Sequence, residues 1–90
     1  MTWRLLKYTP LELHLRSIPQ NVAEVNITFA EIERLLGAQL PESAAIYREW
    51  WSNQRDTSNR PQSHAWQSAG FEVDEVVLDK ANGHVRFRRK

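Results

Sequence analysis

The sequence predicts an α+β domain in which three to four helices form a cluster and a C-terminal β-hairpin follows them. Capping residues at Thr9 and Thr28 each precede apolar residues at helical spacing, which predicts the helices. Apolar and polar residues alternate on both sides of the turn dipeptide Asn82-Gly83, which predicts the hairpin. Ninety residues suit one hydrophobic core, so we expect a single domain over residues 1–90.

The first predicted helix begins at Thr9, which suits the N-cap position, and Pro10 suits the first helical position. Glu12 completes a capping box with Thr9. Pro19 ends the helix, because the residue before a proline avoids the helical region. The apolar stripe between these points consists of Leu11, Leu15 and Ile18.

The second helix follows a linker at residues 20–26, in which we expect a short extended piece around Val25. Thr28 and Glu31 form a second capping box, and Gly37 stands where a left-handed C-cap is expected. The side chains expected to be buried on this helix are Phe29, Ile32, Leu35 and Leu36.

A third helix is predicted to open at residues 40–43 and to continue through Tyr47 to Trp51 or Ser52. Consecutive helical residues point about 100° apart, so Trp50 and Trp51 cannot both lie at the centre of one narrow face. We therefore expect one tryptophan in the core and the other on a neighbouring surface, at the place where the core ends.

A polar loop is predicted at residues 52–62, and it is long for so small a domain. Long structured loops are enriched in function, which makes this segment the first place to look for a site. A short fourth helix is expected from Pro61 or Ser63 to Ala69, with Gly70 as its C-cap.

The hairpin strands are predicted at residues 71–78 and 84–88. On the second strand, Val85 and Phe87 are expected to point inward, and the residues between them outward. The alternation on the first strand slips between residues 75 and 77, which predicts a bulge or a local twist.

Composition excludes several classes of protein. The chain has no cysteine, which excludes disulfides, thiol nucleophiles and cysteine-ligated zinc. Its three histidines are scattered, and no glycine-rich phosphate loop, nucleophile elbow or paired-carboxylate pattern occurs. We therefore expect no enzymatic activity, no metal and no cofactor. The first residues match neither a signal peptide nor a membrane span, so we expect a cytoplasmic protein without membrane association.

The polar middle of the chain and the hairpin carry the candidate binding residues. Arginines suit phosphates, amide side chains suit base edges, tryptophan faces suit stacking, and a helix N-terminus offers free N–H groups to a phosphate. The predicted nucleic-acid-binding residues are Arg48, Trp51, Asn53, Arg55, Arg60, Ser63, His64, Gln67, Arg86 and Arg88. The leading functional hypothesis is therefore DNA binding by a small non-catalytic domain.

The same residues have other interpretations, and the sequence leaves them open. The tryptophans can belong to the core, with the polar residues in a solvated loop. The hairpin arginines can protect an edge strand, or they can pair across the strands with Glu72, Asp74 or Glu75, which would neutralise them.

A protein-interaction module is the rival hypothesis, and the near-zero net charge of +1 favours it. In that case an exposed tryptophan and Tyr47 would anchor a mostly apolar patch on a partner, as in a phage- or defence-related inhibitor or a partner subunit. A small-molecule sensor with an aromatic pocket is a third option. The sequence leaves the oligomeric state open.

Several motifs, taken in order, carry a resemblance over nearly the whole chain, from about Tyr8 to Arg88. They are the segment Thr28–Ala44, which fits the pattern TFxxIExxLGxxLPxSA, then Trp50-Trp51-Ser52-Asn53, and then Trp66 with Ala69-Gly70. The chain resembles a widespread bacterial domain of unknown function that has this pattern and a closing hairpin. His14 departs from it, since an aromatic residue is expected there.

The resemblance implies a bacterial or phage cytoplasmic protein and implies no known activity. Members of such a family that are joined to nuclease-like domains favour nucleic acid or host–phage conflict. The predicted order of helix, extended piece, three helices and hairpin resembles a winged helix-turn-helix, with its turn at residues 37–41.

Overall fold

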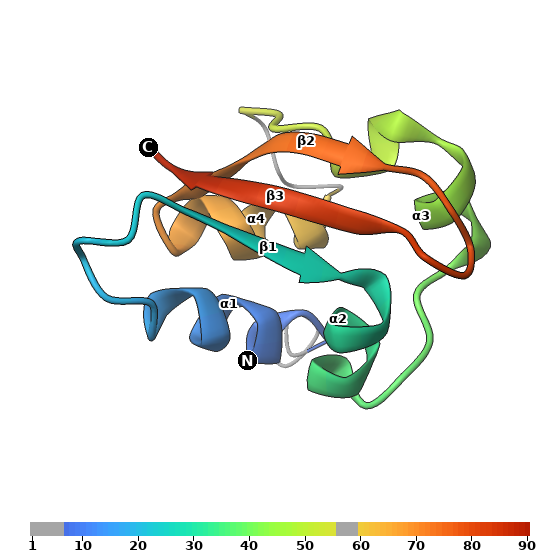
Figure 1. The fold of residues 1–90 in the computed structure, drawn as a ribbon, viewed down its shortest axis with the longest axis horizontal. Coiled ribbons are helices and arrows are strands. Elements are labelled where there is room, and N and C mark those ends of the chain that lie inside the picture. Colours follow the sequence, from blue (N-terminus) through green and yellow to red (C-terminus); the bar gives the residue numbers. More distant parts are fainter. Residues whose placement is uncertain (1–6, 56–59) are drawn as a thin grey trace.

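The computed structural model describes residues 7–55 and 60–90 and has the predicted α+β fold, with a C-terminal β-hairpin (Figure 1). The elements, in chain order, are α1 (Thr9–Arg16), β1 (Glu24–Thr28), α2 (Phe29–Leu36), α3 (Glu42–Ile46), the 3-10 helix η2 (Arg48–Trp51), α4 (Pro61–Ser68), β2 (Phe71–Val77) and β3 (His84–Arg89). Within the described residues, no helix is long and apolar enough to cross a membrane.

The sheet has three antiparallel strands in the order β1-β3-β2. The predicted hairpin is confirmed as β2 and β3, and the expected extended piece becomes a third strand that pairs with β3. The register places Ile27 opposite Val85 and Val25 opposite Phe87 on the buried face. The predicted bulge is confirmed between Val73 and Glu75.

The capping box of α2 is confirmed in both directions. The Thr28 hydroxyl accepts the backbone N–H of Glu31 at 3.0 Å, and the Glu31 carboxylate accepts the backbone N–H of Thr28 at 3.0 Å. Gly37 ends the helix with a φ of 71°, the left-handed region that glycine adopts without strain. The box predicted at α1 is wrong, because Tyr8 takes the N-cap position and Glu12 binds Arg16 instead.

The predicted third helix is interrupted at Tyr47, where the backbone is extended, with φ of −111° and ψ of 121°. The interruption lets Trp51 turn back, so that its indole N–H donates to the Ala44 carbonyl at 2.7 Å. In a continuous helix that carbonyl would accept a backbone N–H four residues later. A buried indole bond therefore replaces a helical one, and η2 leaves at a new angle.

The hairpin turn differs from the two-residue turn that Asn82-Gly83 favours, because such a turn needs positive φ angles. Among the described residues, only Gly37 and Gly70 have a positive φ. Instead, Asp79 organises a longer turn, in which its carbonyl accepts the N–H of Gly83 at 2.7 Å. Gly83 is required for space, since a Cβ at this position would overlap the Phe29 ring.

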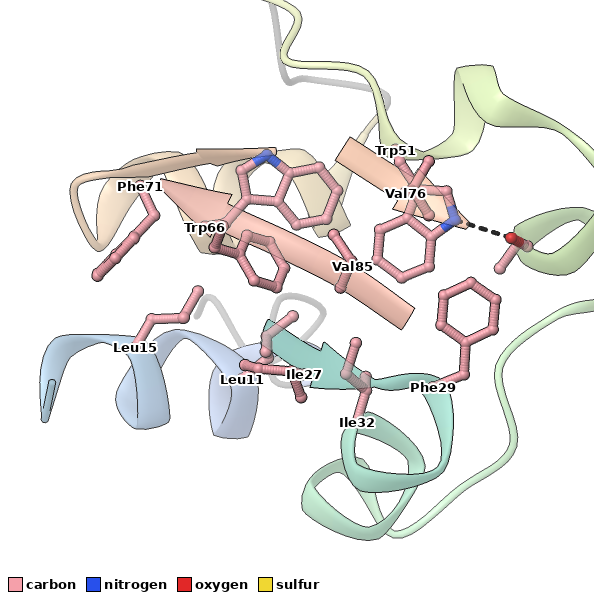
Figure 2. Close-up of a cluster of buried hydrophobic side chains, with 12 residues drawn as sticks. Leu11, Leu15, Ile27, Phe29, Ile32, Trp51, Trp66, Phe71, Val76 and Val85 are labelled. Atoms are coloured by element: carbon pink, nitrogen blue, oxygen red, sulfur yellow. Dashed lines mark hydrogen bonds between the residues drawn. The ribbon is translucent and has the colours of Figure 1, made fainter. Parts of the chain in front are cut away.

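Aromatic rings form a column through the core, between the helices and the inner face of the sheet (Figure 2). Phe29 stacks on Trp51 at 5.1 Å between ring centroids, Trp51 stacks on Trp66 at 5.8 Å, and Trp66 reaches Phe87 at 5.6 Å. Burial of such large rings supplies much of the stability of a 90-residue domain. The opposite face of the sheet carries charged side chains.

Candidate functional site

Trp51 belongs to the core, which settles how the tryptophan pair is divided. Its side chain is 2% exposed, whereas Trp50 is partly buried at the margin of the core. Trp50 also contacts the Tyr8 ring edge-on at 6.0 Å. The prediction that Trp51 contributes to a binding surface is therefore wrong, because a buried indole offers no face for stacking.

Asn53 fastens the segment after η2 to the edge of the sheet. Its side-chain amide donates to the Val73 carbonyl at 2.9 Å and accepts the Val73 N–H at 2.8 Å, as a neighbouring strand would. The same oxygen accepts the indole N–H of Trp66 at 2.9 Å. Asn53 was predicted to contact a ligand, and the structure engages its side-chain amide within the fold.

Helix α4 directs its polar side chains toward the segment that follows η2. The Ser63 hydroxyl donates to the Ser52 carbonyl at 2.9 Å, and the Gln67 amide donates to the Gln54 carbonyl at 2.6 Å. Ser63 is 1% exposed, so its predicted place on a binding surface is wrong. His64 is partly buried beside Ser68 on the same helix.

The three arginines around the polar loop have different surroundings. Arg48 donates to the Val76 carbonyl at 3.0 Å, and Arg60 donates to the Glu49 carbonyl at 3.3 Å. Arg55 is exposed. Part of the predicted loop, residues 56–59, lies outside the described residues.

The hairpin arginines lie in a lattice of carboxylates, which is the cross-strand alternative that the sequence left open. Arg86 is 2.7 Å from Asp74 and 3.5 Å from Glu75, and Arg88 is 3.2 Å from both Asp74 and Glu72. Hydrogen bonding to Asp74 raises the pKa of Arg86, with the Asp74, Glu75 and Glu24 charges adding to the effect. With Glu24 included, two arginines among four carboxylates give this face a formal charge of −2.

A different surface carries the exposed apolar residues, and the sequence did not predict it as a unit. Ile46 is 58% exposed, Tyr47 56% and Val77 39%, and we call these three residues the α3 patch. The bond from Arg48 to the Val76 carbonyl holds the end of α3 beside the end of β2. Helical spacing predicted Ile46 and Tyr47 to pair with the two tryptophans, and the break at Tyr47 turns them to solvent instead.

A groove of about 480 Å³ adjoins the patch at Ile46. Its apolar lining comes from α2, α3 and the segment between them, and consists of Phe29, Leu40, Pro41, Ala44, Ala45 and Ile46. Glu33, Glu42 and Lys80 stand among its polar residues. An apolar groove beside exposed apolar side chains is the geometry of a contact surface.

The described residues bring together no group of three histidine, aspartate or glutamate side chains that could hold a metal ion. A family model described as a domain of unknown function (DUF7662) matches residues 8–90 of the chain. Neither a curated protein nor a solved structure matches it.

Proposed function

The chain belongs to the DUF7662 family, a domain of unknown function, and from this premise we propose that it is a non-catalytic protein-interaction module whose contact surface is the α3 patch. The observation that carries the proposal is the adjacency of Ile46 and Tyr47, both more than half exposed, next to an apolar groove. Exposed apolar clusters of this kind mark partner surfaces on small proteins.

Tyr47 has the properties of an interface anchor. Tyrosine offers a large apolar ring and a polar tip at a low entropic cost, and it is enriched among residues that dominate binding energy. Ile46 and Val77 would surround it with apolar area, while exposed Glu42 and Lys80 would belong to a polar rim.

The lattice on the outer sheet face favours this hypothesis over DNA binding. Arg86 and Arg88 would have to leave their carboxylate partners to reach a phosphate backbone, and the face as a whole repels polyanions. Helix α4 precedes the hairpin, where a winged helix places its reading helix, yet every one of its residues is buried or partly buried.

The test uses the immobilised protein in an extract of its source organism, with Tyr47→Ser as the variant and quantitative mass spectrometry as the measurement. Leu13→Ser is the matched control, because Leu13 is 60% exposed and lies on α1. A partner captured by the wild type and by Leu13→Ser should be lost with Tyr47→Ser.

Calorimetry with that purified partner should then give a dissociation constant at least about 30-fold weaker for Tyr47→Ser, the loss of a dominant anchor. Both variants should melt within a few degrees of the wild type. If every captured protein binds Tyr47→Ser and Leu13→Ser equally, the α3 patch is not the contact surface.

DNA binding stays a prediction and is tested separately. Fluorescence anisotropy with a labelled duplex, at about 50 and 200 mM salt, measures both the affinity and its salt dependence. Binding that weakens steeply with salt and is lost with Arg55→Ala and Arg60→Ala would replace the interaction hypothesis with the nucleic-acid one.

A further inference from the structure

Strand β1 is an edge of the sheet, and its backbone has one unpaired side. Its hydrogen-bonded partners are the odd-numbered residues, since the Ala23 carbonyl accepts from Arg89 and the Phe29 N–H donates to Gly83. With the antiparallel register, Val25 and Ile27 therefore bond to β3. The N–H and C=O groups of Glu24 and Asn26 point away from the sheet.

The other edge of the sheet is covered. On β2, the Asn53 side chain bonds both backbone groups of Val73, and Arg48 bonds the Val76 carbonyl. Side chains thus occupy the outward positions of β2 as a fourth strand would. No hydrogen bond from another described residue reaches the outward backbone groups of Glu24 and Asn26.

A hollow of about 210 Å³ lies beside β1, where α1 and α2 approach the edge. Its lining residues are His14, Ile27, Glu31, Arg34 and Leu35. The Glu31 carboxylate is engaged by the N–H and hydroxyl of Thr28, so Arg34 and His14 set the charge that a ligand meets. The hollow therefore combines an apolar wall with cationic or polar neighbours.

We propose that the β1 edge binds an extended, acidic segment of a partner protein by strand addition. The segment would form up to four backbone hydrogen bonds with Glu24 and Asn26, and an apolar side chain on its inner face would enter the hollow beside Ile27 and Leu35. An acidic side chain next to it would face Arg34. This surface is separate from the α3 patch and does not depend on it.

A second copy of the chain is a poorer occupant of this edge. Two-fold pairing of β1 with itself would bring two copies of Arg34 and His14 to one seam, and like charges in juxtaposition oppose association. Charge complementarity therefore selects an acidic segment. Self-association is the outcome that the experiment must exclude.

The experiment uses the whole chain labelled with nitrogen-15 and an acetylated peptide of alternating Val and Glu residues as the probe. Spectral shifts should centre on Glu24, Asn26 and Arg34, and the outward amides should become protected from exchange. The matched peptide, with Lys in place of Glu, should bind at least about tenfold more weakly.

Asn26→Pro is the decisive variant, because it removes an outward N–H while leaving every β1–β3 hydrogen bond in place. It should weaken the acidic peptide about tenfold or more. Asn26→Ala should bind as the wild type does, since its side chain lies on the outer face.

Three results would overturn the proposal. One is the absence of shifts at Glu24 and Asn26 with millimolar acidic peptide. Another is equal binding of the peptide by folded Asn26→Pro, checked by its spectrum and melting curve. The last is a dimer in analytical ultracentrifugation whose formation protects the Glu24 and Asn26 amides without any peptide.

Discussion

Single residues decide which parts of this fold are held and which are free. Asn53 shows this most clearly, since one exposed amide makes three hydrogen bonds that join the segment after η2, α4 and β2. Gly83 decides by absence, because the Phe29 ring occupies the space of a side chain. Both positions lie far in sequence from the groups that they contact.

Asn53→Ala should destabilise the domain by about 2–3 kcal/mol, because it leaves the Trp66 indole N–H without its partner and uncovers the edge at Val73. Urea unfolding followed by tryptophan fluorescence measures the change. Gln54→Ala is the control and should stay within about 0.5 kcal/mol, as is usual for an exposed side chain. Equal losses in both variants would contradict this account of Asn53.

Gly83→Ala should cost about 1–3 kcal/mol, because its Cβ would meet a core ring that is itself stacked on Trp51. Gly37→Ala is the comparison, since its Cβ would have open space and only its φ of 71° is strained. Adding Phe29→Leu should recover part of the loss in Gly83→Ala and none in Gly37→Ala. Thermal melts of the five proteins, including the wild type, decide the matter.

At the scale of elements, short-range signals were predictable and long-range ones were not. The box at Thr28 and Glu31 spans three residues and forms as predicted. The end of the third helix was not predictable, because it depends on an indole that reaches the carbonyl of Ala44. Ion pairing of the ladder depends on a strand register that includes a bulge.

The candidate site follows the same division. Arg86 and Arg88 were correctly expected on the outer face, because side chains alternate along a strand. Ser63 and Trp51 were expected at the surface and are buried, since bonds to Ser52 and Ala44 hold them inward. A polar sequence between two helices looks the same whether its side chains face solvent or hold the loop.

The α2 capping box should make stability depend on pH. Hydrogen bonds from the Thr28 N–H and then its hydroxyl hold the pKa of Glu31 below its ordinary value of 4.5, with Arg34 and His14 adding to the effect. A lowered pKa in the folded state contributes stability above the ordinary value, and this is lost as the pH falls through the folded pKa.

The unfolding free energy should therefore fall between about pH 6 and pH 3, and it should fall less steeply in Glu31→Gln. Some slope should remain in that variant, because the N–H groups of Ala81 and Asn82 likewise lower the pKa of Asp79. Urea titrations across this range measure both slopes. Parallel curves for the two proteins would refute the role given to Glu31.

Amide hydrogen exchange should alternate along β1. The Val25 and Ile27 amides bond to β3 and should exchange slowly, whereas those of Glu24 and Asn26 should exchange fast. The Val73 amide on the opposite edge should be slow in the wild type and fast in Asn53→Ala. Slow exchange at Glu24 and Asn26 in the isolated protein would mean that something already covers this edge.

At the scale of the whole molecule, one side chain ties distant parts of the chain together. Arg89 donates to the carbonyls of Ile18, Pro19 and Val22, at 3.3, 2.8 and 3.2 Å, and its guanidinium lies 4.6 Å from the centre of the Phe71 ring. It thus joins β3 to the connection between α1 and β1.

Arg89→Ala should lower the unfolding free energy by about 2–3 kcal/mol, through the lost hydrogen bonds and the lost ring contact. Arg88→Ala is the control, because its ion pairs lie on an exposed face and should contribute about 1 kcal/mol or less. Chemical unfolding of both variants makes the comparison. A larger loss for Arg88→Ala would reverse the roles assigned to these neighbours.

The strand order β1-β3-β2 has a consequence for biosynthesis. The central strand, which both other strands require, is the last of the described elements to leave the ribosome. Until β3 emerges, β1 and β2 have no partner strand, and the column of aromatic rings lacks Phe87. The domain must therefore complete its fold after its last strand is made, and a stalled nascent chain would display unpaired strands and uncovered tryptophans to chaperones.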